Sequence, residues 1–121
     1  MGVRAIRGAT TVEHNAEKDI TEETKLLLEE IMQVNDINKQ ELISIFFTTT
    51  KDVNAEFPAV AARELALYNV PLMCAHEMDV PHGIKNCIRI MMHVNTNKSL
   101  DDICHIYLKE AKKLRPDLSE G

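Results

Sequence analysis

Residues 88–94 read IRIMMHV, a pattern in which every second residue from Ile88 to Val94 is apolar. A strand turns alternate side chains to opposite faces, so this spacing predicts a β-strand with one buried face. Arg89 and His93 would then point to the other face. An arginine within such a strand must pair with a carboxylate or bind another anion, because removing an unpaired charge from water is costly. Arg89 is therefore a candidate for an ion pair or for an anion-binding site on this strand.

The segments around this strand alternate between strand and helix patterns. β-Branched and aromatic residues dominate the predicted strands, whereas apolar residues three and four positions apart mark the predicted helices. We expect strands at Val3–Gly8, with an extension over Thr10–Val12, and at Leu42–Thr50, Val70–Ala75 and Ile88–Val94. We expect helices from Asn15 to about Val34, from Phe57-Pro58 through Leu67, and from Ser99 to about Lys112. This order predicts an α/β or α+β fold with helices on one face of the sheet. Of the two we expect α+β, with a mixed β-sheet and two main helices packed on one face. The uncovered face predicts self-association.

The size and composition of the chain limit the classes of protein to which it can belong. Its 121 residues suit a single domain, assigned to 1–121, with 115–121 expected to form a mobile C-terminal tail. The formal net charge of -5 disfavours nucleic acid and anionic membranes as partners. We find no run with the length of a membrane span and no signal-peptide core at the N-terminus. The three cysteines have no disulfide pattern, which favours a cytoplasmic protein.

Two arginines on predicted strands are the main candidates for a binding site. Arg7 lies near the end of the first strand, and Arg89 lies inside the last one. A guanidinium presents a planar set of donors that fits a carboxylate. Structural ion pairs are also common, and the residues alone leave the two interpretations about even.

Several other polar residues have weaker signals. Cys74, His76 and Glu77 lie close together, but no CxxC or HExxH spacing accompanies them, so we expect neither a metal nor a cofactor. A nucleophilic Cys74 is less common than a buried structural one. Tyr107 belongs either to the core of its predicted helix or to the edge of a pocket.

Ordered segments over nearly the whole chain share one resemblance. They are Val3–Glu13 (VRAIRGATTVE), Phe57–Ala59 with Arg63–Leu65, Val70-Pro71 with Cys74 and Glu77–Val80, Cys87–Met92, His105–Leu108 and Leu114–Leu118. Together they resemble the small monofunctional bacterial chorismate mutases. Any one segment would be a weak signal, whereas the ordered set is specific.

The resemblance implies a trimeric pseudo-α/β barrel with sheets facing inward and active sites in the clefts between subunits. The implied reaction is the rearrangement of chorismate to prephenate, on the route to phenylalanine and tyrosine. This Claisen-type reaction is unimolecular and needs no nucleophile, metal or redox cofactor. Negative charge grows on the ether oxygen as its bond breaks. A fixed cation there stabilises the transition state more than the ground state.

The resemblance also implies catalytic roles for three residues. Arg89 would face the ether oxygen, and Arg7 would hold a substrate carboxylate. Glu77 would accept a hydrogen bond from the substrate hydroxyl, with Cys74 beside it. In a regular strand Cys74 and Glu77 point to opposite faces, so the chain must turn between them if both face the ligand.

Further residues are implied to line the pocket. Phe57 would form an apolar wall, Tyr107 would contact a carboxylate, and Arg63 and Arg115 would add positive potential at the mouth. The segment from Met73 to Glu77 would add backbone groups. The full set of implied substrate contacts is Arg7, Phe57, Ala59, Arg63, Met73, Cys74, Ala75, His76, Glu77, Arg89, Tyr107 and Arg115.

The chain departs from the family pattern at a few positions. Val60 stands where a basic residue is expected, Met73 stands where a small hydroxyl residue is expected, and the 67–69 link is one residue short. These departures affect secondary carboxylate contacts. Two alternatives stay open: a non-catalytic carboxylate-binding regulatory module on the same trimeric scaffold, and a trimeric enzyme such as an imine deaminase. Glu77 and Tyr107 in family register argue against the deaminase.

Overall fold

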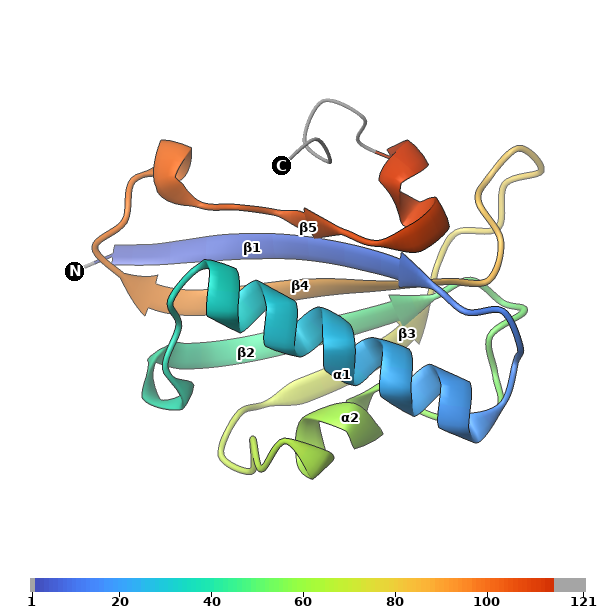
Figure 1. The fold of residues 1–121 in the computed structure, drawn as a ribbon, viewed down its shortest axis with the longest axis horizontal. Helices are drawn as coiled ribbons and strands as arrows, with labels where there is room; N and C mark the ends of the chain where they lie inside the picture. The colour runs from blue at the N-terminus through green and yellow to red at the C-terminus, as the bar shows by residue number, and fades with distance from the viewer. Residues whose placement is uncertain (1, 115–121) are drawn as a thin grey trace.

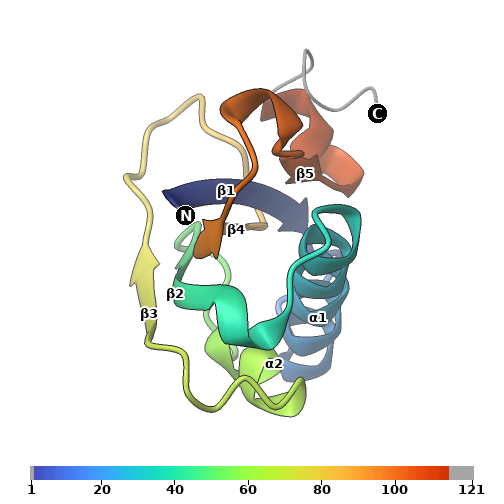
Figure 2. The ribbon, with the colours of Figure 1, turned by 90° about the vertical axis from the view of Figure 1, so that its left-hand side faces the viewer.

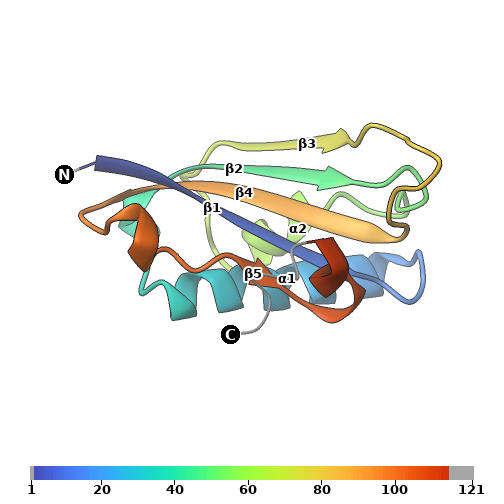
Figure 3. The ribbon, with the colours of Figure 1, turned by 90° about the horizontal axis from the view of Figure 1, so that it is seen from above.

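The computed structural model describes residues 2–114. Its strands are β1 (Gly2–Thr11), β2 (Leu42–Thr49), β3 (Leu72–His76), β4 (Cys87–Thr96) and β5 (Ile106–Tyr107). Its α-helices are α1 (Glu17–Val34) and α2 (Ala59–Glu64), and 3-10 helices form at Lys39–Glu41, Leu100–Asp102 and Lys109–Leu114. The strands make one mixed sheet of order β3-β2-β4-β1-β5, and α1 and α2 lie on the same side of it (Figures 1 and 3). The predicted α+β class is confirmed.

Strand β4 lies at the centre of the sheet. It pairs antiparallel with β1 and with β2, while the edge strands β3 and β5 run parallel to β2 and β1. The predicted alternation is confirmed, because Ile88, Ile90, Met92 and Val94 are each 2% exposed or less. These side chains face α1 and α2, so the side chain of Arg89 belongs to the opposite face.

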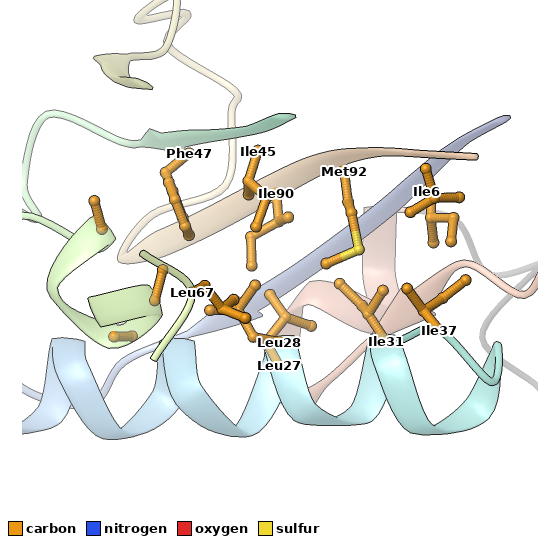
Figure 4. Packing of buried hydrophobic residues seen from close by; sticks show 14 of the residues in the cluster. Ile6, Leu27, Leu28, Ile31, Ile37, Ile45, Phe47, Leu67, Ile90 and Met92 are labelled. Atoms are coloured by element: carbon orange, nitrogen blue, oxygen red, sulfur yellow. The ribbon is translucent and has the colours of Figure 1, made fainter. Parts of the chain in front are cut away.

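The main hydrophobic core fills the space between the sheet and α1 (Figure 4). Leu27, Leu28 and Ile31 of α1 are fully buried, and strand residues such as Ile90 point down toward them. At Gly8 of β1 an added Cβ would lie 2.6 Å from Cδ1 of Ile31, so the helix approaches the strand backbone closely there. Burial of this apolar surface holds α1 against the sheet.

Both α-helices have boundaries that differ from the predicted ones. Helix α1 is capped by Ala16, whereas Asn15 accepts hydrogen bonds from the backbone N–H groups of Asn54 (2.9 Å) and Ala55 (3.0 Å). The polar side chain predicted to cap the helix therefore holds a distant loop. Helix α2 ends at Glu64 rather than Leu67 because the chain turns left-handed at Ala66, with φ of 62°.

The predicted long helix from Ser99 to about Lys112 is wrong. Only a short 3-10 turn follows Ser99, and the chain then extends so that Ile106 and Tyr107 pair with Gly8 and Ala9 of β1. The apolar spacing of this segment fits a helix, but the unpaired edge of β1 offers backbone hydrogen bonds that decide its conformation. The segment after β5 forms another 3-10 helix, Lys109–Leu114.

The face of the sheet opposite α1 and α2 is only partly covered. Near Ala9 and Cys87 it is packed by Tyr107 and by Ala111 of the last 3-10 helix. Farther along, Phe46, Met73 and Met91 are adjacent in the strand register, and all three are exposed. Figure 2 shows the strands curving over the two helices, with this outer face turned away from them.

Neither α-helix in residues 2–114 combines the length and the apolar composition needed to cross a membrane.

Candidate active site

Arg89 lies in a row of side chains that crosses the open face of the sheet. The strand register places Ala9 of β1 on one side of Arg89 and Thr48 of β2 on the other. The row continues to Tyr107 beyond Ala9 and to Ala75 beyond Thr48. Residues that are directly opposite on neighbouring strands share a face, so four strands deliver their side chains to the surroundings of Arg89.

Arg89 forms an ion pair with Glu77, the residue that follows β3. Its Nε lies 3.0 Å from Oε2 of Glu77, and the Glu77 side chain is only 13% exposed. The backbone N–H of Glu77 donates to the carbonyl of Thr49 at 2.8 Å, which extends the parallel pairing and fixes where the side chain begins. The buried Nε–H of Arg89 is not aligned for a hydrogen bond with any described residue. The guanidinium is therefore paired in charge through Nε, while 32% of the Arg89 side chain remains exposed.

Two cavities adjoin Arg89. One of about 410 Å³ lies beneath the loop that leaves β3, with Glu77, Lys51 and Lys85 also in its wall. The loop itself projects beyond the end of the sheet (Figure 1). The second, of about 200 Å³, lies on the open face between Arg89 and Arg7. The structure thus brings together the two predicted arginines around a space that can hold an anionic group.

Tyr107 presents a buried hydroxyl in the same region. The residue is 5% exposed and packs against Ala9 and Cys87, on the same side of the sheet as Arg89. Its hydroxyl has no hydrogen-bond partner among residues 2–114. A buried, unpaired hydroxyl is unfavourable unless a ligand or another group completes it. Tyr107 is on an edge strand and not on the predicted helix, and this placement puts it in the arginine row.

Cys87 lies close to Glu77 and Arg89, but its thiol is not reactive. Burial raises the pKa of its thiol to about 11, and the negative charge of Glu77 acts in the same direction against the opposing effect of Arg89. The side chain is consequently a neutral thiol at physiological pH. Neither Cys87 nor Thr48 was singled out from the sequence as a site residue. Strand alternation with Arg89 would have found Cys87, whereas Thr48 depends on the register between β2 and β4.

A second group of predicted contacts lies at the β3 edge of the sheet. Phe57, Cys74 and His76 border a cavity of about 290 Å³, and Ala75 also contributes to its wall. Burial raises the pKa of Cys74, opposed by a hydrogen bond from the backbone of Ala59 and by the charge of Arg63. Burial thus disfavours a thiolate at Cys74.

The expectation that Cys74 lies beside Glu77 is not met within one chain. Cys74 is opposite Phe47 in the register and packs on the helix side, whereas Glu77 contacts Thr48 and Arg89 on the open side. The chain stays regular between them, so the turn that would bring both to one ligand is absent in residues 74–77.

The predicted residues therefore form two groups. The first group is Arg7, Glu77, Arg89 and Tyr107; the second is Phe57, Ala59, Arg63, Cys74 and His76. Met73 is exposed on the open face opposite Phe46, and Arg115 lies outside the described residues. Within residues 2–114, no three His, Cys, Asp or Glu side chains are placed to hold a metal ion.

The chorismate mutase type I family profile matches residues 3–118, which is nearly the whole chain. This chain belongs to the chorismate mutase type I family. Chorismate mutase AroH of Bacillus subtilis (strain 168) is 47% identical over 120 residues, covering 98% of this chain and 94% of that protein. Chorismate mutase AroH of Thermus thermophilus is 42% identical over 120 residues, covering 98% of each.

The fold agrees with that family membership. A solved chorismate mutase from Clostridium thermocellum superposes with a TM-score of 0.90 and 50% sequence identity, over 91% of this chain and 98% of that one. At this level of identity, the mixed sheet and its helices can be treated as the chorismate mutase fold.

Proposed function

We propose that the chain rearranges chorismate to prephenate at a site centred on Arg89. It is an isomerase of the chorismate mutase family, and it serves the biosynthesis of aromatic amino acids. The observation that carries the site assignment is Arg89 itself, a strand arginine that is paired with Glu77 and lines two cavities. Its guanidinium belongs to a side chain that is 32% exposed, and it is suited to an oxygen that gains charge during the reaction.

Arg89 acts on the breaking bond. As the carbon–oxygen bond of the ether lengthens, electron density moves to the ether oxygen, and a fixed guanidinium stabilises that density more than it stabilises the neutral ether. The proximity of Glu77 prevents Arg89 from turning away, because breaking the ion pair would leave a largely buried carboxylate without a counter-charge. The group is thus preorganised, and it forms no covalent bond with the substrate.

Arg7, Glu77 and Tyr107 orient the substrate. Arg7 lines the smaller cavity together with Arg89, and it holds one carboxylate. Glu77 accepts a hydrogen bond from the ring hydroxyl, and the unpaired Tyr107 hydroxyl donates to a carboxylate. Holding the flexible side chain of chorismate near its chair-like reactive conformer removes much of the entropic barrier.

The remaining residues complete the site from a neighbouring subunit in a trimer. The two groups of predicted contacts face different sides of one sheet, and this separation is expected if each cleft combines one group from each of two chains. Phe57, Ala59, Cys74 and the backbone of 73–76 then form the far wall. Arg63 and Arg115 add positive charge at the mouth. The exposed Phe46, Met73 and Met91 on the open face provide an apolar surface for association.

The wider setting follows from the same features. We assign residues 1–121 to one catalytic domain without a nucleic-acid or membrane partner. A cytoplasmic location is supported by three cysteines that are all free in the structure.

The loss of chorismate absorbance in the ultraviolet tests this proposal. Wild-type protein is expected to convert chorismate, and Arg89→Ala should lose about 10²–10³-fold in turnover while folding normally. Arg4→Ala is a matched control, because Arg4 is also a strand arginine but lies on β1 and donates to the carbonyl of Lys98 at 3.0 Å. Tight binding of prephenate by wild-type trimer without turnover would identify the regulatory module instead. Near-wild-type turnover in Arg89→Ala would remove Arg89 from the mechanism.

A further inference from the structure

We propose that Thr48 is a positioning residue that holds one oxygen of the Glu77 carboxylate next to Arg89 and leaves the other oxygen for the substrate. Its hydroxyl donates a 2.7 Å hydrogen bond to Oε2 of Glu77, the same oxygen that lies 3.0 Å from Nε of Arg89. Oε1 is then the oxygen left for the substrate hydroxyl. This inference rests on the role proposed for Glu77 and extends it to a residue on a different strand.

The fold places Thr48 accurately for this task. Thr48 and Arg89 are directly paired between β2 and β4, so their side chains rise side by side from the open face. Glu77 reaches them from the end of β3, and the bond from its N–H to the carbonyl of Thr49 ties its backbone to the same strand. Strand β2 thus holds Glu77 at two points, one on the backbone and one at the tip of the side chain.

Without the contact from Thr48, both oxygens of Glu77 could accept hydrogen bonds from Arg89. A free carboxylate next to a guanidinium tends to take two parallel hydrogen bonds, which would occupy donors that the ether oxygen needs. Thr48 draws Oε2 to itself and leaves a single contact with Nε that is not aligned as a hydrogen bond. The charge of Arg89 is then balanced through one oxygen of Glu77 and not through a pair of parallel hydrogen bonds.

Three variants of Thr48 test the proposal by steady-state kinetics with chorismate. Thr48→Val keeps the shape of the side chain and removes the hydroxyl, so kcat/KM should fall by about 10- to 100-fold, the range for a hydrogen bond to a charged group. Thr48→Ser keeps the donor and should recover most of that loss. Thr48→Ala removes the donor with a smaller side chain and should show the same loss in kcat/KM. It replaces Thr48→Val in the test if the valine variant does not fold.

A matched control separates positioning from stability. Thr24 is buried in α1 and donates a 2.6 Å bond to the carbonyl of Ile20, far along the chain from the cavities beside Arg89. Thr24→Val makes the same chemical change and should lower stability with kcat and KM unchanged. In a Glu77→Gln background, Thr48→Val should have a much smaller effect, because the carboxylate that it positions is absent.

The outcomes distinguish this inference from the proposed function. If wild-type protein does not convert chorismate, the proposed function fails and the inference fails with it. If Glu77→Gln and Arg89→Ala are impaired but Thr48→Val and Thr48→Ala keep wild-type kcat and KM, only the role of Thr48 is overturned. Equal kinetic losses in Thr48→Val and Thr24→Val would mark both as structural and would also overturn it.

Discussion

Asn35 fastens the C-terminal end of α1 to the segment that carries β5, and its replacement should be costly. The residue is 2% exposed. Its side-chain amide donates to the carbonyls of Ile31 and Cys104, both at 2.9 Å, and its Oδ1 accepts the N–H of Cys104 at 2.8 Å. Asn35 thus imitates one step of strand pairing between α1 and a residue 69 positions away.

The expected magnitude follows from those three bonds. Each contributes about 1 kcal/mol net, so Asn35→Ala should lower the free energy of unfolding by about 3 kcal/mol. With a urea m-value of about 2 kcal/mol/M, the midpoint should shift by about 1.5 M. Asn35→Asp should lose at least as much, because it places an oxygen against the carbonyls of Ile31 and Cys104.

Urea titration followed by circular dichroism measures this effect. All variants are compared at one protein concentration, because association adds to apparent stability. Asn97→Ala, at an exposed asparagine, is the control and should leave the midpoint unchanged. A shift of less than about 0.5 M for Asn35→Ala, at constant m, would refute the reasoning.

Two further predictions concern the backbone and a buried thiol. Ala66 has a left-handed conformation (φ 62°) at the end of α2, where the N–H of Leu67 donates to the carbonyl of Ala62 and the N–H of Ala66 donates to the carbonyl of Arg63. Because glycine adopts this conformation without strain, Ala66→Gly should raise the free energy of unfolding by about 1 kcal/mol. Urea titration measures this, and a lower stability would contradict the prediction. Burial raises the pKa of Cys87 from 9.0 to about 11, so the unfolded chain ionises first; the contribution of this thiol is intact below pH 9 and is lost as the pH rises toward 11. Between pH 8 and 10.5 the free energy of unfolding of Cys87→Ala should accordingly fall by about 1–2 kcal/mol less than that of the wild type. An equal fall in the two proteins would show that Cys87 does not contribute to the pH dependence.

The sequence predicts the central part of the fold because local pattern and tertiary contact agree there. Ile88 to Val94 alternate in the sequence, and they pack on α1 as the alternation requires. The segment 99–112 was predicted wrongly because its apolar spacing suits a helix, whereas its conformation depends on Asn35 and on the edge of β1. Those partners are distant in sequence and leave no local signal.

The site shows the same division. From the sequence, Arg89 could be either part of a structural ion pair or part of an anion site. The structure shows an ion pair with Glu77 at the edge of two cavities. Thr48 was missed because only the register between β2 and β4 makes it a neighbour of Arg89. The positions of Cys74 and Glu77 on opposite sides follow from strand alternation alone.

The most direct test of the mechanism is the separate measurement of kcat and KM for Arg89→Ala. An interaction made only in the transition state lowers kcat and kcat/KM together. We expect kcat to fall by about 10²–10³-fold with KM changed far less. A variant that keeps its kcat and shows only a raised KM would mean that Arg89 binds the substrate without acting on the breaking bond, and it would contradict the account.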